Sequence, residues 1–330
     1  MPYYNYILDR AGWTEHLRDV LKQMPLSLFF LVVLTFGPAS PTCSSSEDAS
    51  VVVNFPKYSI GNLHLVRNAE LTWNPVVDQK MYAEARGSVR VPFHTKLRLI
   101  LNHKGSETEA LSNLEKAPVG AIYGIDAGNM ESFNDTSMNE VAKILGLREL
   151  QLLNTEVSNK GLNCLQRQTR LEKLHLGETN VDSHCIPMIA RLKSLVVLNL
   201  HLTDLKGADL SPLGQLSKLR ILNISNSRLS SFAGISKIQS LEELVVCGNK
   251  DYTDADVMQL KALKHLNSLN ISDTSVTEAC IPALKSMNLK VLEVSWPPQV
   301  VARLKKEMPN TLILARDKPR MSPSLFAPLH

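Results

Sequence analysis

A short apolar motif, leucine-x-x-leucine-x-leucine, recurs at nearly constant spacing along the last two thirds of the chain. Its copies begin at Leu147, Leu171, Leu195, Leu219, Leu241, Leu266 and Leu289, after a degenerate first copy at Ile122. The intervals are 25, 24, 24, 24, 22, 25 and 23 residues. At a hydrophobic content of 44%, independent draws would make every motif position apolar with a probability on the order of 10⁻⁹. The repeat therefore predicts a solenoid of stacked units.

Each unit divides into a strand, a turn and a short helix. The turn after the strand carries a hydroxyl, which we expect to face inward and bond main-chain groups left unpaired there. The second half reads as a short helix, as in Ile186–Leu192 and Ile281–Met287. Parallel strands joined by crossover helices predict a right-handed α/β coil. The turn hydroxyls are those of Thr155, Thr179, Thr203, Ser227 and Thr274.

The units resemble the bacterial leucine-rich repeats of the form L-x-x-L-x-L-x-x-T-x-V-x-x-x-G-L, which stands almost intact from Leu147 to Leu162. The segment from Val301 to Ile313 resembles the terminal cap of such proteins, and residues 55–57, 83–92 and 96–99 resemble the small β-rich segment that precedes the repeats in some members. The resemblance implies an α/β horseshoe with its parallel sheet on the concave face. It implies a binding protein without specifying a ligand.

We expect four parts along the chain. Residues 1–48 form a signal or anchor segment with a linker, and residues 49–116 a small β-rich capping domain with strand signals at 63–66, 87–91 and 97–101. Residues 117–314 form a solenoid of about eight units. Residues 315–330, with three prolines and no apolar period, form a flexible tail.

The apolar run Leu26–Phe36 indicates export. It has about eleven residues where a bilayer span needs about twenty, and it follows Arg18 and Lys22 and precedes small residues, as in a secretory signal. We therefore expect a periplasmic, cell-envelope or secreted protein. Three alternatives stay open: a true start at Met24, an uncleaved membrane anchor, and a lipid anchor on Cys43.

Charge and motifs exclude several function classes. Thirty-six Lys and Arg against thirty-two Asp and Glu give a net charge of +4, and only 5% of residues are aromatic, so we expect no nucleic-acid partner. No metalloprotease, nucleophile-elbow or phosphate-loop motif occurs, and we predict neither an enzyme nor a cofactor. His175 and His201 near Glu178 lack a convergent carboxylate, so no metal site is predicted. Cys185 is read as a packing residue rather than a nucleophile.

The candidate binding residues lie on the concave face. In each strand, motif positions 3, 5 and 7 point away from the buried leucines and line up across the sheet. We expect a polar surface with an apolar island that binds a protein or peptide, on a monomeric chain. Alternatives are an envelope-anchored structural or surface element and an intracellular adaptor that presents substrates. The candidate residues are Glu149, Gln151, Lys173, His175, Val197, Asn199, His201, Ile221, Asn223, Val245 and Asn270.

Overall fold

The computed structural model describes residues 50–66, 77–92, 95–107 and 109–316. The predicted signal or anchor segment, with its apolar run and Cys43, lies outside these ranges, as does the predicted tail beyond Arg316. Across the described ranges, no helix combines the length and apolar character that crossing a membrane requires.

Five strands come first along the described chain, and after β5 short strands alternate with short helices. The strands are β1 (Ser50–Asn54), β2 (Gly61–Val66), β3 (Val77–Glu84), β4 (Ser88–Pro92), β5 (Leu97–Leu101), β6 (Ile122–Asp126), β7 (Glu149–Gln151), β8 (Lys173–His175), β9 (Val197–Asn199), β10 (Ile221–Asn223), β11 (Glu243–Val245), β12 (Ser268–Asn270), β13 (Val291–Val294) and β14 (Leu312–Ala315). The α-helices are α4 (Asp135–Val141), α5 (Asn159–Leu162), α6 (Cys185–Ile189), α7 (Asp254–Gln259), α8 (Ile281–Lys285) and α9 (Pro298–Glu307). The 3-10 helices are η2 (His103–Ser106), η3 (Ser112–Lys116), η4 (Asn163–Arg167), η5 (Ser211–Gln215), η6 (Ala233–Lys237), η7 (Leu260–Ala262) and η8 (Glu278–Cys280).

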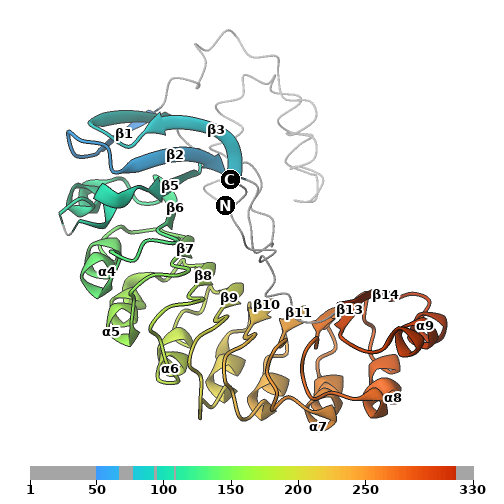
Figure 1. Cartoon of the computed structure of the whole chain (residues 1–330). Helices are drawn as coiled ribbons and strands as arrows, with labels where there is room; N and C mark the ends of the chain where they lie inside the picture. Colours follow the sequence, from blue (N-terminus) through green and yellow to red (C-terminus); the bar gives the residue numbers. More distant parts are fainter. Residues whose placement is uncertain (1–49, 67–76, 93–94, 108, 317–330) are drawn as a thin grey trace, which may run out of the picture. The chain divides into compact units, whose positions relative to one another are not determined.

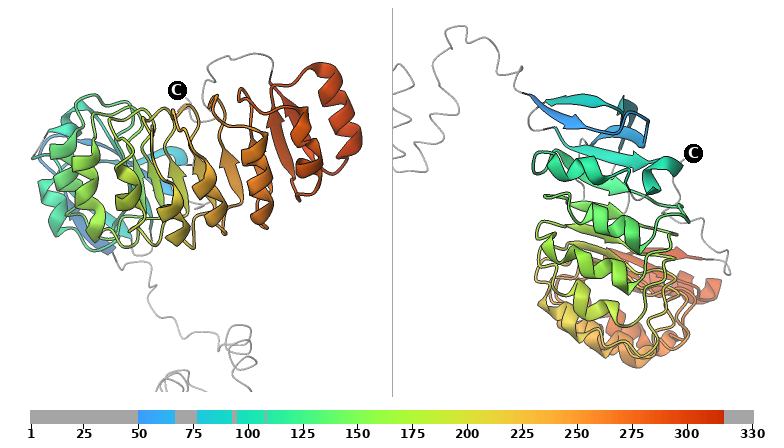
Figure 2. Two further views of the ribbon diagram at one scale, coloured as in Figure 1. Left: turned by 90° about the horizontal axis from the view of Figure 1, so that it is seen from below. Right: turned by 90° about the vertical axis from the view of Figure 1, so that its left-hand side faces the viewer.

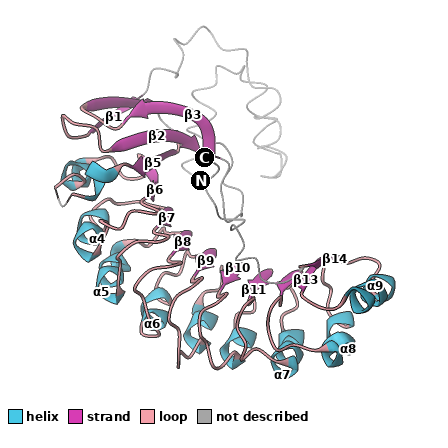
Figure 3. Cartoon of the chain, viewed as in Figure 1, coloured by secondary structure: helices cyan, strands magenta, loops and turns pink. Residues whose placement is uncertain are grey.

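A twelve-stranded sheet contains every strand except β1 and β4. Its strand order is β14-β13-β12-β11-β10-β9-β8-β7-β6-β5-β2-β3, and every neighbouring pair from β5 to β14 is parallel. The strands line the inner side of an arc, and the helices lie on its outer side (Figures 1 and 3). Two further views show the same separation of strands and helices (Figure 2). The predicted α/β leucine-rich-repeat solenoid is confirmed.

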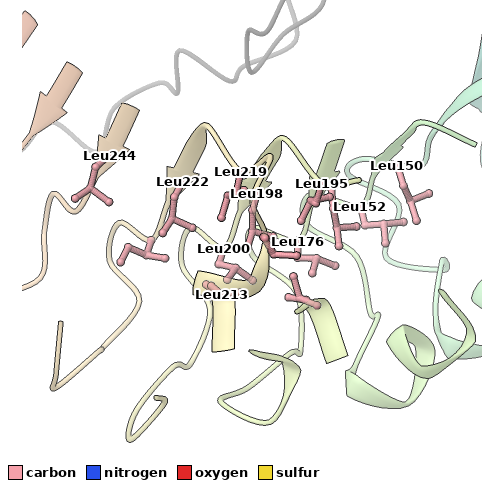
Figure 4. Close-up of a cluster of buried hydrophobic side chains, with 14 of the residues drawn as sticks. Leu150, Leu152, Leu176, Leu195, Leu198, Leu200, Leu213, Leu219, Leu222 and Leu244 are labelled. Atoms are coloured by element: carbon pink, nitrogen blue, oxygen red, sulfur yellow. The ribbon is translucent and has the colours of Figure 1, made fainter. Parts of the chain in front are cut away.

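The motif leucines form the core between the strands and the outer helices. Leu150, Leu174, Leu198 and Leu222 occupy the same register position on consecutive strands, and each is fully buried. Leu150, Leu198 and Leu222 lie beside the buried leucines of the neighbouring motif positions (Figure 4). Because each leucine packs on its counterpart in the next unit, no unit can bury its apolar face alone, and the units stabilise one another.

The turn hydroxyls act as predicted. Each donates to the carbonyl three residues earlier, at the point where the chain leaves the strand. In the repeat of β11, where Asn249 replaces the hydroxyl residue, its amide donates to the carbonyls of Val246 and Ile224 at 2.9 and 2.8 Å. The hydroxyl bonds are Thr155 to Leu152 at 2.8 Å, Thr179 to Leu176 at 2.6 Å, Thr203 to Leu200 at 2.7 Å, Ser227 to Ile224 at 2.7 Å and Thr274 to Ile271 at 2.7 Å.

The same turns use a left-handed backbone residue in nearly every unit. Asn154, Asn226 and Asp273 have φ of 53°, 51° and 59°, which is common for short polar side chains. Leu202 occupies the same place at φ 53° and is 42% exposed. Two units after Leu202, Gly248 takes this place because an added Cβ would lie 2.0 Å from Asn226 Oδ1.

The β-rich segment before the repeats continues the sheet. Strand β5 pairs in parallel with β6 on one side and antiparallel with β2 on the other, and β2 pairs with β3. Leu63 and Leu99 are fully buried and prolong the apolar core beyond the first repeat. Strands β1 and β4 form a separate antiparallel pair. Main-chain pairing along β5 thus closes the edge that β6 would otherwise expose.

Candidate binding face of the sheet

The register aligns the predicted binding residues in two rows that run across the strands on the side opposite the leucines. The first concave row contains Gly124, Glu149, Lys173, Val197, Ile221, Glu243, Ser268 and Val291. The second concave row contains Asp126, Gln151, His175, Asn199, Asn223, Val245, Asn270 and Glu293. Of the predicted binding residues, only His201 lies outside the two rows. It follows Asn199 by two residues, just after β9 ends.

Eight of the eleven predicted binding residues are buried. Val197 is 0% exposed and Asn223 is 1% exposed, whereas Gln151, His201 and Val245 are partly exposed. This differs from the open polar surface that the alternation of the strand indicates. Polar side chains on parallel strands about 4.8 Å apart can bond to one another and to the main chain, and this contributes to their burial.

The amides of the second concave row have a defined orientation. In the three asparagines of the row, the side-chain oxygen accepts the backbone N–H two residues later, which turns the amide NH₂ away from that bond. The NH₂ of Asn270 donates to Glu293 Oε2 at 2.9 Å. Asn223 Nδ2 is buried and has no hydrogen-bond partner in the described structure. The oxygens and donors are Asn199 with His201 at 2.9 Å, Asn223 with Ser225 at 2.9 Å, Asn270 with Ser272 at 3.0 Å and Asp126 with Gly128 at 3.0 Å.

A buried cluster of charges lies at the β5–β8 end of the rows. Arg98, which is 8% exposed, donates to Glu149 Oε2, and Lys173 Nζ lies 3.0 Å from Glu149 Oε1. Burial raises the pKa of Glu149, but Arg98 and Lys173 outweigh it and the net pKa is lowered. Burial, with a further contribution from Arg98, lowers the pKa of His175 to about 4, so this imidazole is neutral at pH 7.

Sequence reasoning missed Arg98. It belongs to the segment that precedes the repeats, and no motif position marks it. Only the parallel pairing of β5 with β6, which aligns Arg98 with Gly124, extends the first concave row to this residue. The alternation of Leu97 and Leu99, both fully buried, with Arg98 between them was the one available signal.

The cysteine and histidine side chains that could act as a nucleophile or a metal ligand are buried or hydrogen-bonded. Cys185 is fully buried and burial raises its pKa to about 12, which leaves the thiol unreactive. His201 Nδ1 lies 2.7 Å from Ser225 Oγ. No group of three His, Cys, Asp or Glu side chains that could hold a metal ion is found in the described part of the chain.

Aligned leucine rows, a parallel strand in each unit and a bonded turn after it define the architecture. The protein is a leucine-rich-repeat solenoid. No family model matches its sequence, and no curated protein matches it either. Its assignment therefore rests on the register, the burial and the turn bonds described above.

The solenoid is similar to solved leucine-rich-repeat structures from bacteria. An internalin (inlF) from Listeria monocytogenes is 19% identical with a TM-score of 0.48, and the similarity covers 67% of each chain. A leucine-rich-repeat protein of Leptospira interrogans is 20% identical with a TM-score of 0.45, covering 62% of this chain and 56% of the other. Internalin C2 from Listeria monocytogenes is 20% identical with a TM-score of 0.40, covering 56% and 84%.

Proposed function

We propose that this protein is a non-enzymatic, exported binding protein that holds a protein or peptide segment against its two concave rows. The observation that carries the proposal is the amide of Asn223. Its oxygen is used by Ser225, and its buried NH₂ has no partner among the described residues. A buried donor without an acceptor costs about 1–3 kcal/mol, which a ligand carbonyl in hydrogen-bond reach would recover.

Two other residues of the second concave row, one on the adjacent strand β11 and one three strands away on β7, suit a peptide. Val245 and Gln151 in the same row are partly exposed, and the buried Oε1 of Gln151 has no hydrogen-bond partner in the described structure. Apolar contact from Val245, a donor from Asn223 and an acceptor from Gln151 would engage both the side chains and the main chain of an extended segment. Export rests on the apolar run Leu26–Phe36.

The test is selection from a phage-displayed library of random dodecapeptides on the full chain, followed by anisotropy titration of an enriched peptide. Val245→Asp places a charge in the second concave row and is expected to weaken binding about tenfold or more. Val119→Asp is the matched control, because Val119 is 61% exposed and belongs to neither row. Enriched peptides that bind the Val245→Asp chain as tightly as the wild type, or no enrichment at all, would show that the concave rows are not the binding site.

A finer variant is Asn223→Asp. The carboxylate can still accept from Ser225, as Asp126 accepts from Gly128 at the equivalent place in the first repeat, but the donor is lost. We expect weaker peptide binding by about tenfold while the chain stays folded. Unchanged affinity would remove Asn223 from the proposed contact.

A further inference from the structure

The charge cluster joins two regions that are far apart in the sequence. Arg98 lies on β5, ahead of the repeats, and it reaches Glu149 on β7, two strands away. Lys173 on β8 contacts the other oxygen of the same carboxylate at 3.0 Å. The cluster therefore spans β5 to β8 on the concave side, the side of the sheet away from the outer helices (Figure 1), and its three side chains are buried among one another.

Gly124 makes this reach possible. It lies between Arg98 and Glu149 in the register of the first concave row. An added Cβ at Gly124 would stand 3.0 Å from Glu149 Cβ and 3.4 Å from Glu149 Oε2. The missing side chain leaves a gap in the row, and the guanidinium of Arg98 extends toward Glu149 across that strand.

The three side chains of the cluster carry a net positive charge, which favours binding of a negatively charged group. Arg98 and Lys173 contribute two positive charges, and the one carboxylate that both contact contributes one negative charge. Asp126, in the second concave row, is an acid that interacts electrostatically with Arg98 and Glu149, and burial raises its pKa. The pKa of Glu149 is lowered in spite of burial, and the cation of His175 is disfavoured by burial and by Arg98.

We propose that Arg98 and Lys173 bind a carboxylate side chain of the peptide ligand, beside Glu149 at the β5–β8 end of the concave rows. The inference rests on the proposed function and specifies its ligand as a segment with an Asp or Glu at one fixed position. The guanidinium provides a planar set of donors that matches a carboxylate. Gln151, partly exposed on the same strand as Glu149, accepts a main-chain N–H of the same ligand through its unpartnered Oε1.

Charge argues against residues 317–330 of this chain as the occupant. The sequence after β14 contains Lys318 and Arg320, and its one acid, Asp317, comes two residues after the strand ends. Lys173 lies on β8, six strands from β14, which is about 29 Å at the usual strand spacing. An acidic segment of another protein fits the cluster better than this basic sequence.

The experiment uses the full chain and the same dodecapeptide library. We expect wild-type selections to enrich Asp or Glu at one position. An enriched acidic peptide should bind Lys173→Met about tenfold more weakly, while its amide counterpart, with Asn or Gln in place of the acid, should bind both chains equally. Glu149→Gln should strengthen binding of the acidic peptide severalfold, because the competing carboxylate loses its charge. Lys143→Met is the matched control, because it also removes a paired lysine but at the end of α4, outside the concave rows. There Lys143 Nζ donates to Glu140 Oε1 at 2.9 Å.

The opposite responses of the two cluster variants separate ligand binding from a structural role. A cluster that only braces β5 against β8 would lower the melting temperature in both variants without changing the preference for acid. Peptides that enrich without an acid, or an acid preference that survives Lys173→Met, would overturn this inference and leave the proposed function standing. Selections that enrich nothing would overturn both. Loss of binding on removal of residues 317–330 would place the carboxylate contact elsewhere.

Discussion

The two sides of the sheet are both largely buried, yet they are built differently. On the outer side the same residue recurs, as in Leu174, Leu198 and Leu222, and each packs on its counterpart. On the concave side neighbouring strands carry Lys173, Val197 and Ile221 at the equivalent place. The leucine side needs only apolar volume, which every unit supplies. The concave side needs specific partners, because a buried polar group is costly unless it is bonded.

This difference indicates that binding specificity depends on the concave side of the sheet. A stack of equivalent leucines stabilises any number of units without distinguishing one from another. The concave rows change from a charge cluster at β5–β8 to amides and apolar residues at β9 and β10. A mutation on the leucine side should therefore change stability, and one on the concave side should change what is bound or how stability depends on pH.

The largest expected effect is on the leucine side. Leu198→Ala removes a fully buried side chain from the middle of the core and should lower the free energy of unfolding by about 2–5 kcal/mol. Urea denaturation followed by circular dichroism measures the change. Leu202→Ala is the control, because Leu202 is 42% exposed and its truncation should cost within about 0.5 kcal/mol. Equal losses in the two variants would contradict the packing described here.

On the concave side, His175 should make stability depend on pH. Its pKa is lowered to about 4 in the folded chain, mainly by burial, against about 6.5 in the unfolded chain. Between these values the unfolded state binds a proton that the folded state does not, so stability falls as the pH drops. The contribution is at most about 1.4 kcal/mol per pH unit.

His175→Gln should remove this part of the dependence. Unfolding free energies of both chains at pH 7, 6 and 5 would be compared, since the difference between their slopes isolates His175 from the other titrating groups. Parallel slopes for the two chains would mean that His175 titrates normally in the folded state.

The smallest effect is expected at the turns where the two sides meet. Thr203→Val removes the hydroxyl that donates to the Leu200 carbonyl at 2.7 Å and should cost about 1 kcal/mol. Thr203→Ser keeps the hydroxyl, as Ser227 does one unit later, and should retain most of the stability. Thermal unfolding of the three chains tests this, and a serine variant as unstable as the valine variant would assign the effect to packing of the methyl group.

The repeat determined the fold because its period and its chemistry agree at every level. The spacing predicted the strands from β6 to β13, and the turn hydroxyls were placed correctly down to their inward bonds. The alternation within each strand also predicted which residues share the concave side. These features depend on neighbours within one unit or in the adjacent unit, and the sequence states them directly.

The charge cluster and the orientation of the amides were beyond sequence reasoning. Arg98 lies 51 residues before Glu149, and their contact depends on β5 pairing with β6 and on the gap at Gly124. Likewise, Asn223 could be placed on the concave side from its strand position, but not the bond that turns its NH₂ away from Ser225.

The sequence by itself thus determined a leucine-rich-repeat solenoid, its parallel sheet and the residues on each side of that sheet. The tertiary structure decided which concave side chains are buried, which pair with each other and where two cations share one carboxylate. The physical reason is range. Apolar periodicity is a local property repeated many times, whereas a buried ion pair forms only when strand register brings distant residues within a few ångströms.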